Sequence, residues 1–250
     1  MIEFINVYKS FDGVPVLKNL SFKIRKGETF VIIGMSGTGK TVTLKNISGL
    51  EEPDGGEVLI NGVRMNGASA KVKRKLRSMM GMVFQSGAML NWLAVGENVA
   101  LPLKEKQDKK YSKSEIDDIV KEKLGILGLH EAIHKMPADI SGGMKKRACL
   151  ARVLVRNPDI ILYDEPTSGL DPVMSAHINE LIKKMQTDFG VTSVVVTHDM
   201  ESAYFLADRI AVLYKGEIIQ CGSPEEIKKS SNPVVTQFVN GKIDGPITVN

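Results

Sequence analysis

The feature that most constrains this chain is a glycine-rich segment between an apolar run, residues 30–33, and a helix-like run, residues 42–49. It reads Gly34-Met35-Ser36-Gly37-Thr38-Gly39-Lys40-Thr41. Glycines let backbone N–H groups turn toward an anion, and the start of the next helix adds unpaired N–H groups and a positive dipole end. The spacing G-x-x-x-x-G-K-[ST] between a strand and a helix therefore predicts a phosphate-binding P-loop.

Two side chains of this loop add chemistry to the backbone cradle. Lys40 brings a full positive charge for the β- and γ-phosphates, and Thr41 offers a hydroxyl to a nucleotide-bound Mg²⁺. The rival dinucleotide fingerprint, G-x-G-x-x-G, does not fit the glycine spacing. A plain glycine-rich turn with a surface lysine would not need a strand before it and a helix after it. The sequence therefore predicts a nucleotide site.

Charge, cysteine content and hydropathy argue against several other classes of protein. The 250 residues include 33 Lys and Arg against 29 Asp and Glu, and a net charge of +4 is too small to argue for nucleic acid. Cys149 and Cys221 lie far apart and outside any C-x-x-C pattern, so neither zinc nor a disulfide framework is indicated, and a reducing compartment fits. We see no signal peptide at the N-terminus and no run of eighteen apolar residues, so we expect any membrane role to depend on a partner.

The remaining patterns predict an α/β domain. Strand signals precede residue 84 and return after residue 157, whereas helical periodicity dominates between them. We therefore expect one domain with an α/β core from residues 1–84 and 157–222, an inserted helical subdomain at 85–156, and a C-terminal helix and tail at 223–250. The expected strands are 2–7, 22–24, 28–33, 57–63 (a hairpin around Asn61-Gly62), 80–84, 159–163, 192–196, 209–214 and 217–221. The expected helices are 71–77, 95–101, 112–127, 142–156, 172–189 and one after Pro224, with a loop-like stretch at 104–113 and a tail from residue 232.

Two weaker patterns each allow a structural and a functional interpretation. The basic helix at 71–77 could contact anionic lipid or nucleic acid, but a solvated helix face is the favoured interpretation. His130 and His134 have a spacing that could hold a metal on a helix. Because no third ligand lies nearby, a packing or surface pair is favoured.

Two carboxylates follow an apolar strand at Asp164-Glu165. A P-loop enzyme needs one acidic group for Mg²⁺ and another group to orient or deprotonate the attacking water. Adjacent residues at a strand end point in different directions, so two roles fit side by side. We assign the metal to Asp164 and the general base to Glu165. His198 also ends a buried strand, and we expect it to contact the γ-phosphate or the attacking water.

A second candidate anion cradle is Ser141-Gly142-Gly143 at the start of a helix. It could be an ordinary N-cap serine with flexible glycines. One terminal phosphate is not easily reached by two such loops of the same chain, so we expect this loop to act on the nucleotide of another subunit.

Together these segments resemble an ATP-binding cassette (ABC) ATPase. The resemblance rests on an ordered set: the Walker A loop, a Gln loop at Gln85, the Ser-Gly-Gly signature, Walker B at Asp164-Glu165, an Asp loop at 168–171 and a switch histidine, His198. It covers nearly the whole chain. It implies the P-loop NTPase ABC ATPase fold: a mixed parallel core sheet, an antiparallel β subdomain and an inserted α-helical subdomain.

The resemblance also implies ATP and Mg²⁺ as cofactors and a head-to-tail homodimer with two ATP molecules between the subunits. Catalysis is assigned to Glu165 and His198. The implied nucleotide contacts are Phe11 (stacked on adenine, with Tyr8 as the alternative), Gly34, Met35, Ser36, Gly37, Thr38, Gly39, Lys40, Thr41, Val42, Gln85, Ser141, Gly142 and Gly143. The implied metal contacts are Thr41, Gln85 and Asp164.

Within this family, three features resemble the ATPase of Mla-type phospholipid transporters. They are Gln85-Ser86-Gly87-Ala88-Met89, Met144 in the signature, and Phe238-Val239-Asn240-Gly241 with Asp244-Gly245-Pro246. The implied function is ATP-driven lipid transport through separate membrane permease subunits, with a lipid-binding accessory protein, at the cytoplasmic face of the inner membrane. Met144 departs from the commoner Gln of the signature, and Phe11 replaces the commoner Tyr.

Alternative functions are an ATPase of another transporter or a soluble iron–sulfur-assembly ATPase. A DNA-maintenance ATPase would carry a long coiled coil or a zinc insertion between the P-loop and the signature. Residues 42–140 contain neither heptads nor cysteines. A ribosome-associated type would carry two cassettes, and this chain has one.

Overall fold

The computed structural model describes residues 1–105 and 111–248. Its strands are β1 (Ile2–Phe11), β2 (Val14–Ile24), β3 (Thr29–Ile33), β4 (Gly55–Ile60), β5 (Val63–Arg64), β6 (Met80–Val83), β7 (Ile160–Asp164), β8 (Thr192–Thr197), β9 (Arg209–Tyr214) and β10 (Glu217–Gly222). Its helices are α1 (Lys40–Ser48), α2 (Ala70–Ser78), α3 (Val95–Lys104), α4 (Lys113–Ile126), α5 (Gly142–Leu154), α6 (Pro172–Phe189), α7 (Met200–Leu206), α8 (Pro224–Lys228) and α9 (Pro233–Val239), with 3₁₀ turns η1 (His130–Ala132) and η2 (Pro137–Asp139).

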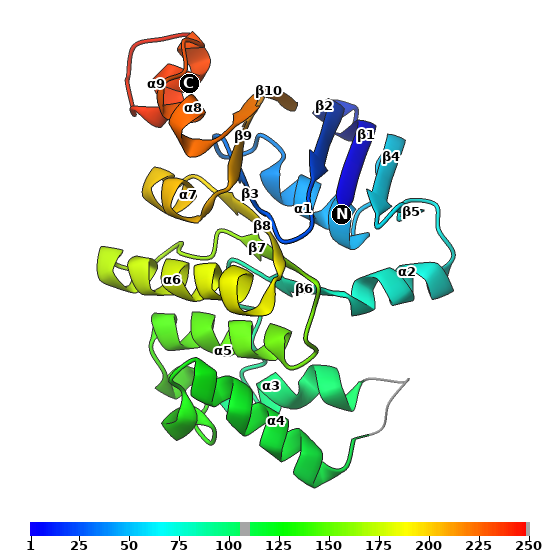
Figure 1. Ribbon diagram of the computed structural model, residues 1–250, viewed down its shortest axis with the longest axis vertical. Coiled ribbons are helices and arrows are strands. Elements are labelled where there is room, and N and C mark those ends of the chain that lie inside the picture. Colours follow the sequence, from blue (N-terminus) through cyan, green and yellow to red (C-terminus); the bar gives the residue numbers. More distant parts are fainter. Residues whose placement is uncertain (106–110, 249–250) are drawn as a thin grey trace.

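The strands form two sheets (Figure 1). The smaller sheet, in the order β2-β1-β4-β5, is antiparallel. The larger sheet has the order β10-β9-β3-β8-β7-β6; its inner strands are parallel, and only β10 runs antiparallel to its neighbour. The predicted fold class, with a mixed parallel core sheet and an antiparallel β subdomain, is confirmed.

The larger sheet is covered on both faces, and β3 shows how. All five residues of β3 are buried. Phe30 and Ile32 face one hydrophobic core, formed with α1 and the antiparallel sheet, whereas Val31 and Ile33 face a second core formed with α3 to α7. A strand buried on both faces is typically a continuous apolar run, and residues 30–33 of β3 form such a run.

Three stacked aromatic rings join the two sheets. Phe22 lies between Phe4 and Phe30, with ring centroids 4.5 Å and 5.4 Å apart. The Arg209 guanidinium lies 5.2 Å from the centroid of the Phe30 ring, and its Nη1 is 3.0 Å from Glu28 Oε1. Stacked rings with a cation over one face contribute more than their buried area alone. This column fixes the antiparallel sheet against β3, the strand that leads into the P-loop.

Helices α6, α5, α3 and α4 lie one beyond another below the larger sheet (Figure 1). α5 packs on α3, α4 and α6, so it joins the helical part to the sheet. Residues 106–110, within the predicted loop-like stretch, lie outside the described residues. The proposed boundaries of the helical subdomain at 85 and 156 stay a prediction. In the described part of the chain, no helix is both long and apolar enough to cross a bilayer.

The C-terminal region corrects the expected tail. Instead of continuing as a tail, the chain forms α9, which Asn232 caps by accepting hydrogen bonds from the backbone N–H groups of Val234 and Val235. Asn before Pro is a helix-start signal that the prediction overlooked. Beyond α9 the chain returns to the helix: the Ile247 backbone N–H donates to Oε1 of Gln237, a buried residue of α9, at 2.7 Å, and Gln237 Nε2 donates to Ile247 O at 3.0 Å. This pair of hydrogen bonds pins the end of the described chain against α9.

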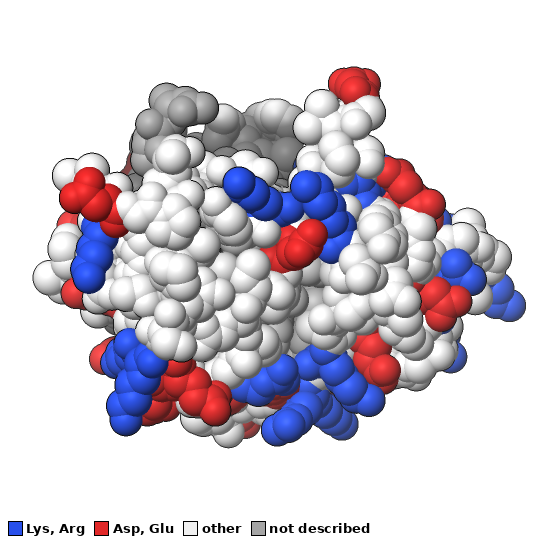
Figure 2. Space-filling view, turned by 90° about the horizontal axis from the view of Figure 1, so that it is seen from above, with Lys and Arg blue, Asp and Glu red and all other residues white. Residues whose placement is uncertain are grey.

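The two weaker sequence patterns have structural explanations. In the basic helix α2, Lys73 pairs with Glu52, and Arg77 Nε donates to Ser48 O at 2.9 Å. η1 spans only His130–Ala132, so His134 lies beyond it and the single helix required by the metal alternative is not formed. Figure 2 shows lysines and arginines both near the middle and along the edges of the face it presents, with acidic residues among them and broad uncharged areas between them.

Candidate functional site

The ends of three neighbouring parallel strands position the site. In the order β3-β8-β7, Ile33 pairs with Thr197 and Asp164 pairs with Val196. The P-loop, the Asp164-Glu165 pair and His198 therefore leave the sheet at the same edge. Ligands gather at this carboxyl edge in open α/β sheets.

The P-loop has the backbone geometry of an anion cradle. Gly37 and Gly39 have φ angles of 79° and 103°, in the left-handed region that favours glycine. A Cβ on Gly39 would also lie 2.7 Å from Leu17 Cδ2, so the loop closes tightly on β2. α1 begins after Gly39 with no side-chain cap and no acidic residue in its first turn. Its first N–H groups and its positive dipole end are thus available to phosphate.

Lys40 folds back over the loop. Its Nζ donates to Gly34 O at 2.8 Å and to Met35 O at 2.9 Å, and the side chain is 8% exposed. Burial lowers the pKa of Lys40, while the Glu165 and Asp164 carboxylates act in the opposite direction. These two hydrogen bonds hold the ammonium group above the loop.

Thr41, in the first turn of α1, contacts Asp164, the last residue of β7. The Thr41 hydroxyl donates to Asp164 Oδ1 at 2.9 Å. Burial raises the pKa of Asp164, and the Thr41 hydrogen bond partly offsets this increase. A hydroxyl and a carboxylate that share one small volume are hard oxygen ligands of the kind Mg²⁺ takes beside a nucleotide. The residues present therefore fit a magnesium ion.

Glu165 is held in an uncommon conformation. Its φ is 48°, in the left-handed region where non-glycine residues are rare and which is often occupied at functional sites. Its backbone N–H donates to Val196 O at 3.0 Å. Its Oε2 accepts from Thr197 Oγ1 at 3.3 Å and lies 2.9 Å from His198 Nδ1. The carboxylate is thus aimed along the edge of the sheet by two residues of the neighbouring strand end.

Lys146 is a polar residue of this region that the sequence analysis missed. It lies in α5 and is 8% exposed, and burial lowers its pKa. Its Nζ donates to the backbone carbonyl oxygens of Gln85 and, at 3.5 Å, Glu165. Only its position one turn after the signature could have indicated this role, because lysine on a helix is otherwise a surface residue.

Gln85 itself is turned toward the Asp loop. Its Nε2 donates to Ser168 Oγ at 3.2 Å. In the described residues, no hydrogen bond joins Gln85 to Thr41 or Asp164. Its assignment to the metal stays a prediction.

The structure does not bring the signature loop to the P-loop of the same chain. Ser141 caps α5 by accepting from Met144 N at 3.3 Å, and both Ser141 and Gly142 are exposed. α5 packs in one hydrophobic core of the larger sheet and α1 in the other. The expectation that Ser141-Gly142-Gly143 meets the phosphate bound by a second chain stays a prediction.

A cavity of about 370 Å³ lies beside the P-loop, lined on one side by Met35, Ser36, Gly37 and Thr38. Its other walls include Pro15, Val16, Tyr214 and the C-terminal residues Ile247 and Thr248. Phe11 and Tyr8 are 41% and 47% exposed and are not part of this wall. Val42 is half-buried against the core beneath α1. The adenine contact of Phe11 stays a prediction, and Val16 is a wall residue that the sequence analysis did not single out.

Comparisons with known proteins show the family to which the chain belongs. Residues 17–168 match the sequence family described as "ABC transporter". The probable ribonucleotide transport ATP-binding protein mkl of Mycobacterium leprae is 42% identical over 246 residues, covering 98% of this chain and 70% of that protein. The protein TRIGALACTOSYLDIACYLGLYCEROL 3, chloroplastic, of Arabidopsis thaliana is 41% identical over 264 residues, covering 99% and 75%.

Solved structures give the same family. A dimeric post-hydrolysis state of the ATP-binding cassette MJ0796 bound to ADP and Pi has a TM-score of 0.83 and 35% identity, covering 90% of this chain and 99% of that one. The chain therefore belongs to the ABC transporter family and is an ATP-binding subunit of a membrane transport system. The prediction of an ABC-type ATP hydrolase is confirmed; such domains bind ATP, dimerise and work with membrane permease subunits.

Proposed function

We propose that this chain hydrolyses Mg²⁺-ATP in a head-to-tail homodimer and thereby powers lipid transport through a separate permease. The observation that carries the hydrolytic part is the arrangement of Thr41, Asp164, Glu165 and His198 at one edge of the sheet, with contacts of 2.9 Å within each pair. A P-loop enzyme needs these oxygen and nitrogen groups close to the terminal phosphate.

In this proposal the P-loop backbone and Lys40 bind the β- and γ-phosphates. Thr41 and Asp164 hold the metal, which when bound supplies positive charge beside the phosphate oxygens. Glu165 accepts a proton from the attacking water, and His198 orients Glu165 and the γ-phosphate. Ser141, Gly142 and Gly143 of the second chain close over the same phosphate.

Closure of such a dimer can be driven only by the difference in ATP affinity between its open and closed forms. A shift from mostly open to mostly closed needs about 5 kcal/mol. Two terminal phosphates that each bridge two chains can provide this through a few charge-assisted hydrogen bonds apiece. Gln85, which bonds to Ser168 and whose carbonyl accepts from Lys146, then transmits closure to the helical part.

Lipid, and specifically phospholipid, is proposed as the cargo because of the Mla-like residues at 85–89 and 238–246 and the relative named for trigalactosyldiacylglycerol. On this proposal the chain works at the cytoplasmic face of the inner membrane with a lipid-binding accessory protein. Ribonucleotide transport is the competing function, because it is the one named for the mycobacterial relative.

The test is purification of the native membrane complex in detergent, followed by mass spectrometry of its subunits and bound small molecules. ATP turnover is then measured with added phospholipid or with an added ribonucleotide other than ATP. Bound phospholipid and lipid-dependent turnover support lipid transport. Turnover that responds to the ribonucleotide but not to phospholipid contradicts it.

A further inference from the structure

Three side chains on one side of α5 donate to backbone carbonyl oxygens of residues 85–88, the start of the Gln loop. Their positions in the helix are three residues apart, which is about one turn. They are Lys146, which bonds to Gln85, Cys149, which bonds to Gly87, and Arg152, which bonds to both Gly87 and Ala88. The helix that begins at the signature therefore holds this loop by its backbone.

Lys146 differs from the other two because it also approaches the residue after β7. Its Nζ lies 3.5 Å from the carbonyl oxygen of Glu165. At this distance the attraction depends on the charge of the ammonium group rather than on a short hydrogen bond. Lys146 is buried, so little water competes for that charge. In the described part of the chain, neither Cys149 nor Arg152 donates to Glu165.

The contacts of Lys146 close a ring around the two loops. Gln85, whose carbonyl accepts from Lys146, donates through Nε2 to Ser168 Oγ at 3.2 Å. The Ser168 backbone N–H in turn donates to the carbonyl oxygen of Glu165 at 3.2 Å. This oxygen is the one that the ammonium group approaches. One buried cation thus joins α5, the Gln loop and the turn after β7.

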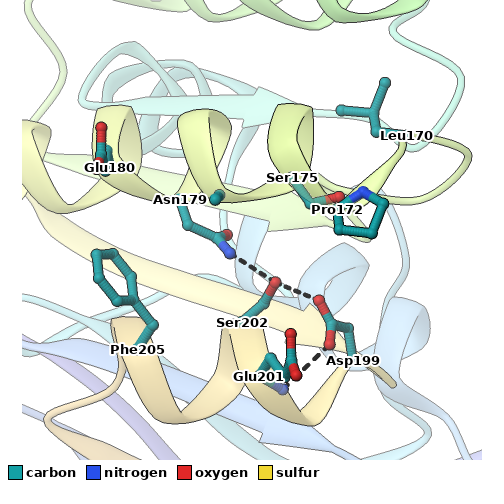
Figure 3. Close-up of a pocket in the computed structure, with 10 residues that line it drawn as sticks. Leu170, Pro172, Ser175, Asn179, Glu180, Asp199, Glu201, Ser202 and Phe205 are labelled. Atoms are coloured by element: carbon teal, nitrogen blue, oxygen red, sulfur yellow. Dashed lines mark hydrogen bonds between the residues drawn. The ribbon is translucent and has the colours of Figure 1, made fainter.

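The Glu165 carboxylate is held separately, through the end of β8. Its Oε2 accepts from Thr197 Oγ1, which itself accepts from the backbone N–H of Asp199 at 3.0 Å. Figure 3 shows how Asp199 is held: Ser202 donates to its carboxylate and accepts from Asn179 Nδ2 at 2.7 Å. The contacts of the carboxylate are therefore anchored in α6 and α7, and those of the backbone carbonyl depend on α5.

We propose that Lys146 is a positioning residue for ATP hydrolysis, which holds the backbone of Glu165 against α5 and the Gln loop. This inference rests on the proposed role of Glu165 as general base. Glu165 needs such a constraint because its φ of 48° is unfavourable for a residue other than glycine. Among the described side chains, Lys146 is the only one outside residues 197–198 that donates to Glu165. Because α5 begins at the signature, a shift of this helix on dimer closure reaches the carboxylate through Lys146.

The first experiment measures steady-state ATP hydrolysis by full-length Lys146→Met. Methionine keeps a long unbranched side chain and removes the ammonium group. We expect kcat to fall about 10-fold, because a charge-assisted contact that aligns the base is lost. The KM for ATP should stay within about 2-fold of wild type, because the P-loop is untouched. An unchanged kcat, or a change confined to KM, would overturn the proposal.

Arg152→Met distinguishes positioning of Glu165 from a general loosening of the loop. It removes two hydrogen bonds to the Gln loop but no contact with Glu165, so its kcat should fall less than about 3-fold. Lys121→Met, on the exposed face of α4, is the surface control. Equal losses in Lys146→Met and Arg152→Met would contradict the proposed role. If Lys146→Met does not fold, Lys146→Gln replaces it and should still lose more than Arg152→Met.

A double-variant cycle separates a failure of this inference from a failure of the proposed function. In a Glu165→Gln background, adding Lys146→Met should change the residual single-turnover rate by less than about 2-fold, because Lys146 acts through Glu165. If Glu165→Gln is inactive but the two losses multiply, Lys146 acts elsewhere and only this inference is wrong. If Glu165→Gln keeps normal turnover, the general-base assignment is wrong and this inference falls with it.

Discussion

His198 Nδ1 lies 2.9 Å from Glu165 Oε2, although the two residues belong to different strand ends. The Glu165 side chain is largely buried, whereas that of His198 is 61% exposed. The exposed ring of His198 thus contacts the carboxylate of Glu165, a residue whose backbone is held at a positive φ. In the proposed function, the ring reaches the bound phosphate from this position while the carboxylate keeps its direction.

Replacing Glu165 with Gln should abolish turnover and trap an ATP-bound dimer. Gln keeps the size of the side chain but cannot accept a proton from water, and loss of a general base reduces rates about 10²- to 10⁴-fold. Steady-state phosphate release and size-exclusion chromatography with ATP measure the two effects. Glu225→Gln is the control for the substitution. Normal turnover in Glu165→Gln would refute the general-base assignment.

Replacing His198 with Ala should lower turnover about 10- to 100-fold, because Glu165 loses one of its two side-chain contacts. ATP binding, measured by fluorescent-nucleotide displacement, should change little. If Glu165 is already Gln, the added His198→Ala change should have almost no further effect, because the two residues act as a unit. Additive losses in this double variant would contradict the proposed coupling.

Asp164→Asn should stabilise the nucleotide-free protein against unfolding at neutral pH. The same substitution should remove the additional stability that Mg²⁺-ATP gives to the wild-type protein. Burial raises the folded-state pKa of Asp164 above the ordinary 3.8, so the folded chain holds this proton more tightly than the unfolded chain does. The ionised carboxylate therefore opposes folding above the raised pKa, and this penalty disappears below the ordinary value.

Melting temperatures of wild type and Asp164→Asn measured across pH check this expectation. The advantage of the Asn variant should be largest near neutrality and should shrink as the pH falls. Asp159→Asn is the matched control, because Asp159 is exposed and lies directly before the first residue of the same strand. A stability advantage of Asp164→Asn over wild type that grows toward acid pH would contradict a raised pKa of Asp164.

Ser141→Arg should reduce hydrolysis about 100-fold, the size of effect seen when a donor to a developing oxyanion is removed. Nucleotide binding to the monomer should stay intact, since Ser141 contacts only the start of its own helix. Ser112→Arg removes an equivalent N-cap from α4 and controls for loss of capping. Weakened ATP binding in the Ser141→Arg monomer would argue against a site completed by a second chain.

Gly39→Ala should destabilise the protein more than Gly37→Ala does. Both residues have a positive φ, which costs about 1–2 kcal/mol for an alanine. Only at Gly39 would the new methyl group also approach Leu17 Cδ2, at 2.7 Å, whereas at Gly37 nothing lies within 4 Å. Urea unfolding of both variants measures the difference. Equal losses would show that backbone strain alone decides.

Much of the fold followed from local patterns. The apolar run of β3 before its glycine loop, and the apolar run of β7 before its carboxylates, were both predicted as strands, because periodicity and turn residues act over a few positions. The P-loop spacing was equally local. By contrast, the sequence analysis predicted a tail where α9 forms, because its seven residues make only about two helical turns, too few to show a clear period.

Long-range relationships could not be obtained in this way. The contact of Lys146 with the carbonyl of Gln85 joins residues 61 positions apart, and apart from the place of Lys146 one turn after the signature, nothing in either segment indicates it. The left-handed backbone of Glu165 is likewise imposed by β8, through Val196 and Thr197. Which of Phe11, Tyr8 and Val16 faces the cavity depends on how β2 packs on the loop, a tertiary property.

The hydrogen bonds that pin Ile247 to Gln237 have a practical consequence for fluorescence work. They bring Thr248 to the cavity wall shared with Met35. A dye attached through Thr248→Cys would report directly on occupancy of the phosphate loop, provided that the exposed Cys221 is first replaced by Ser. The buried Cys149 could stay, and probes or affinity tags meant to be silent belong on another part of the surface.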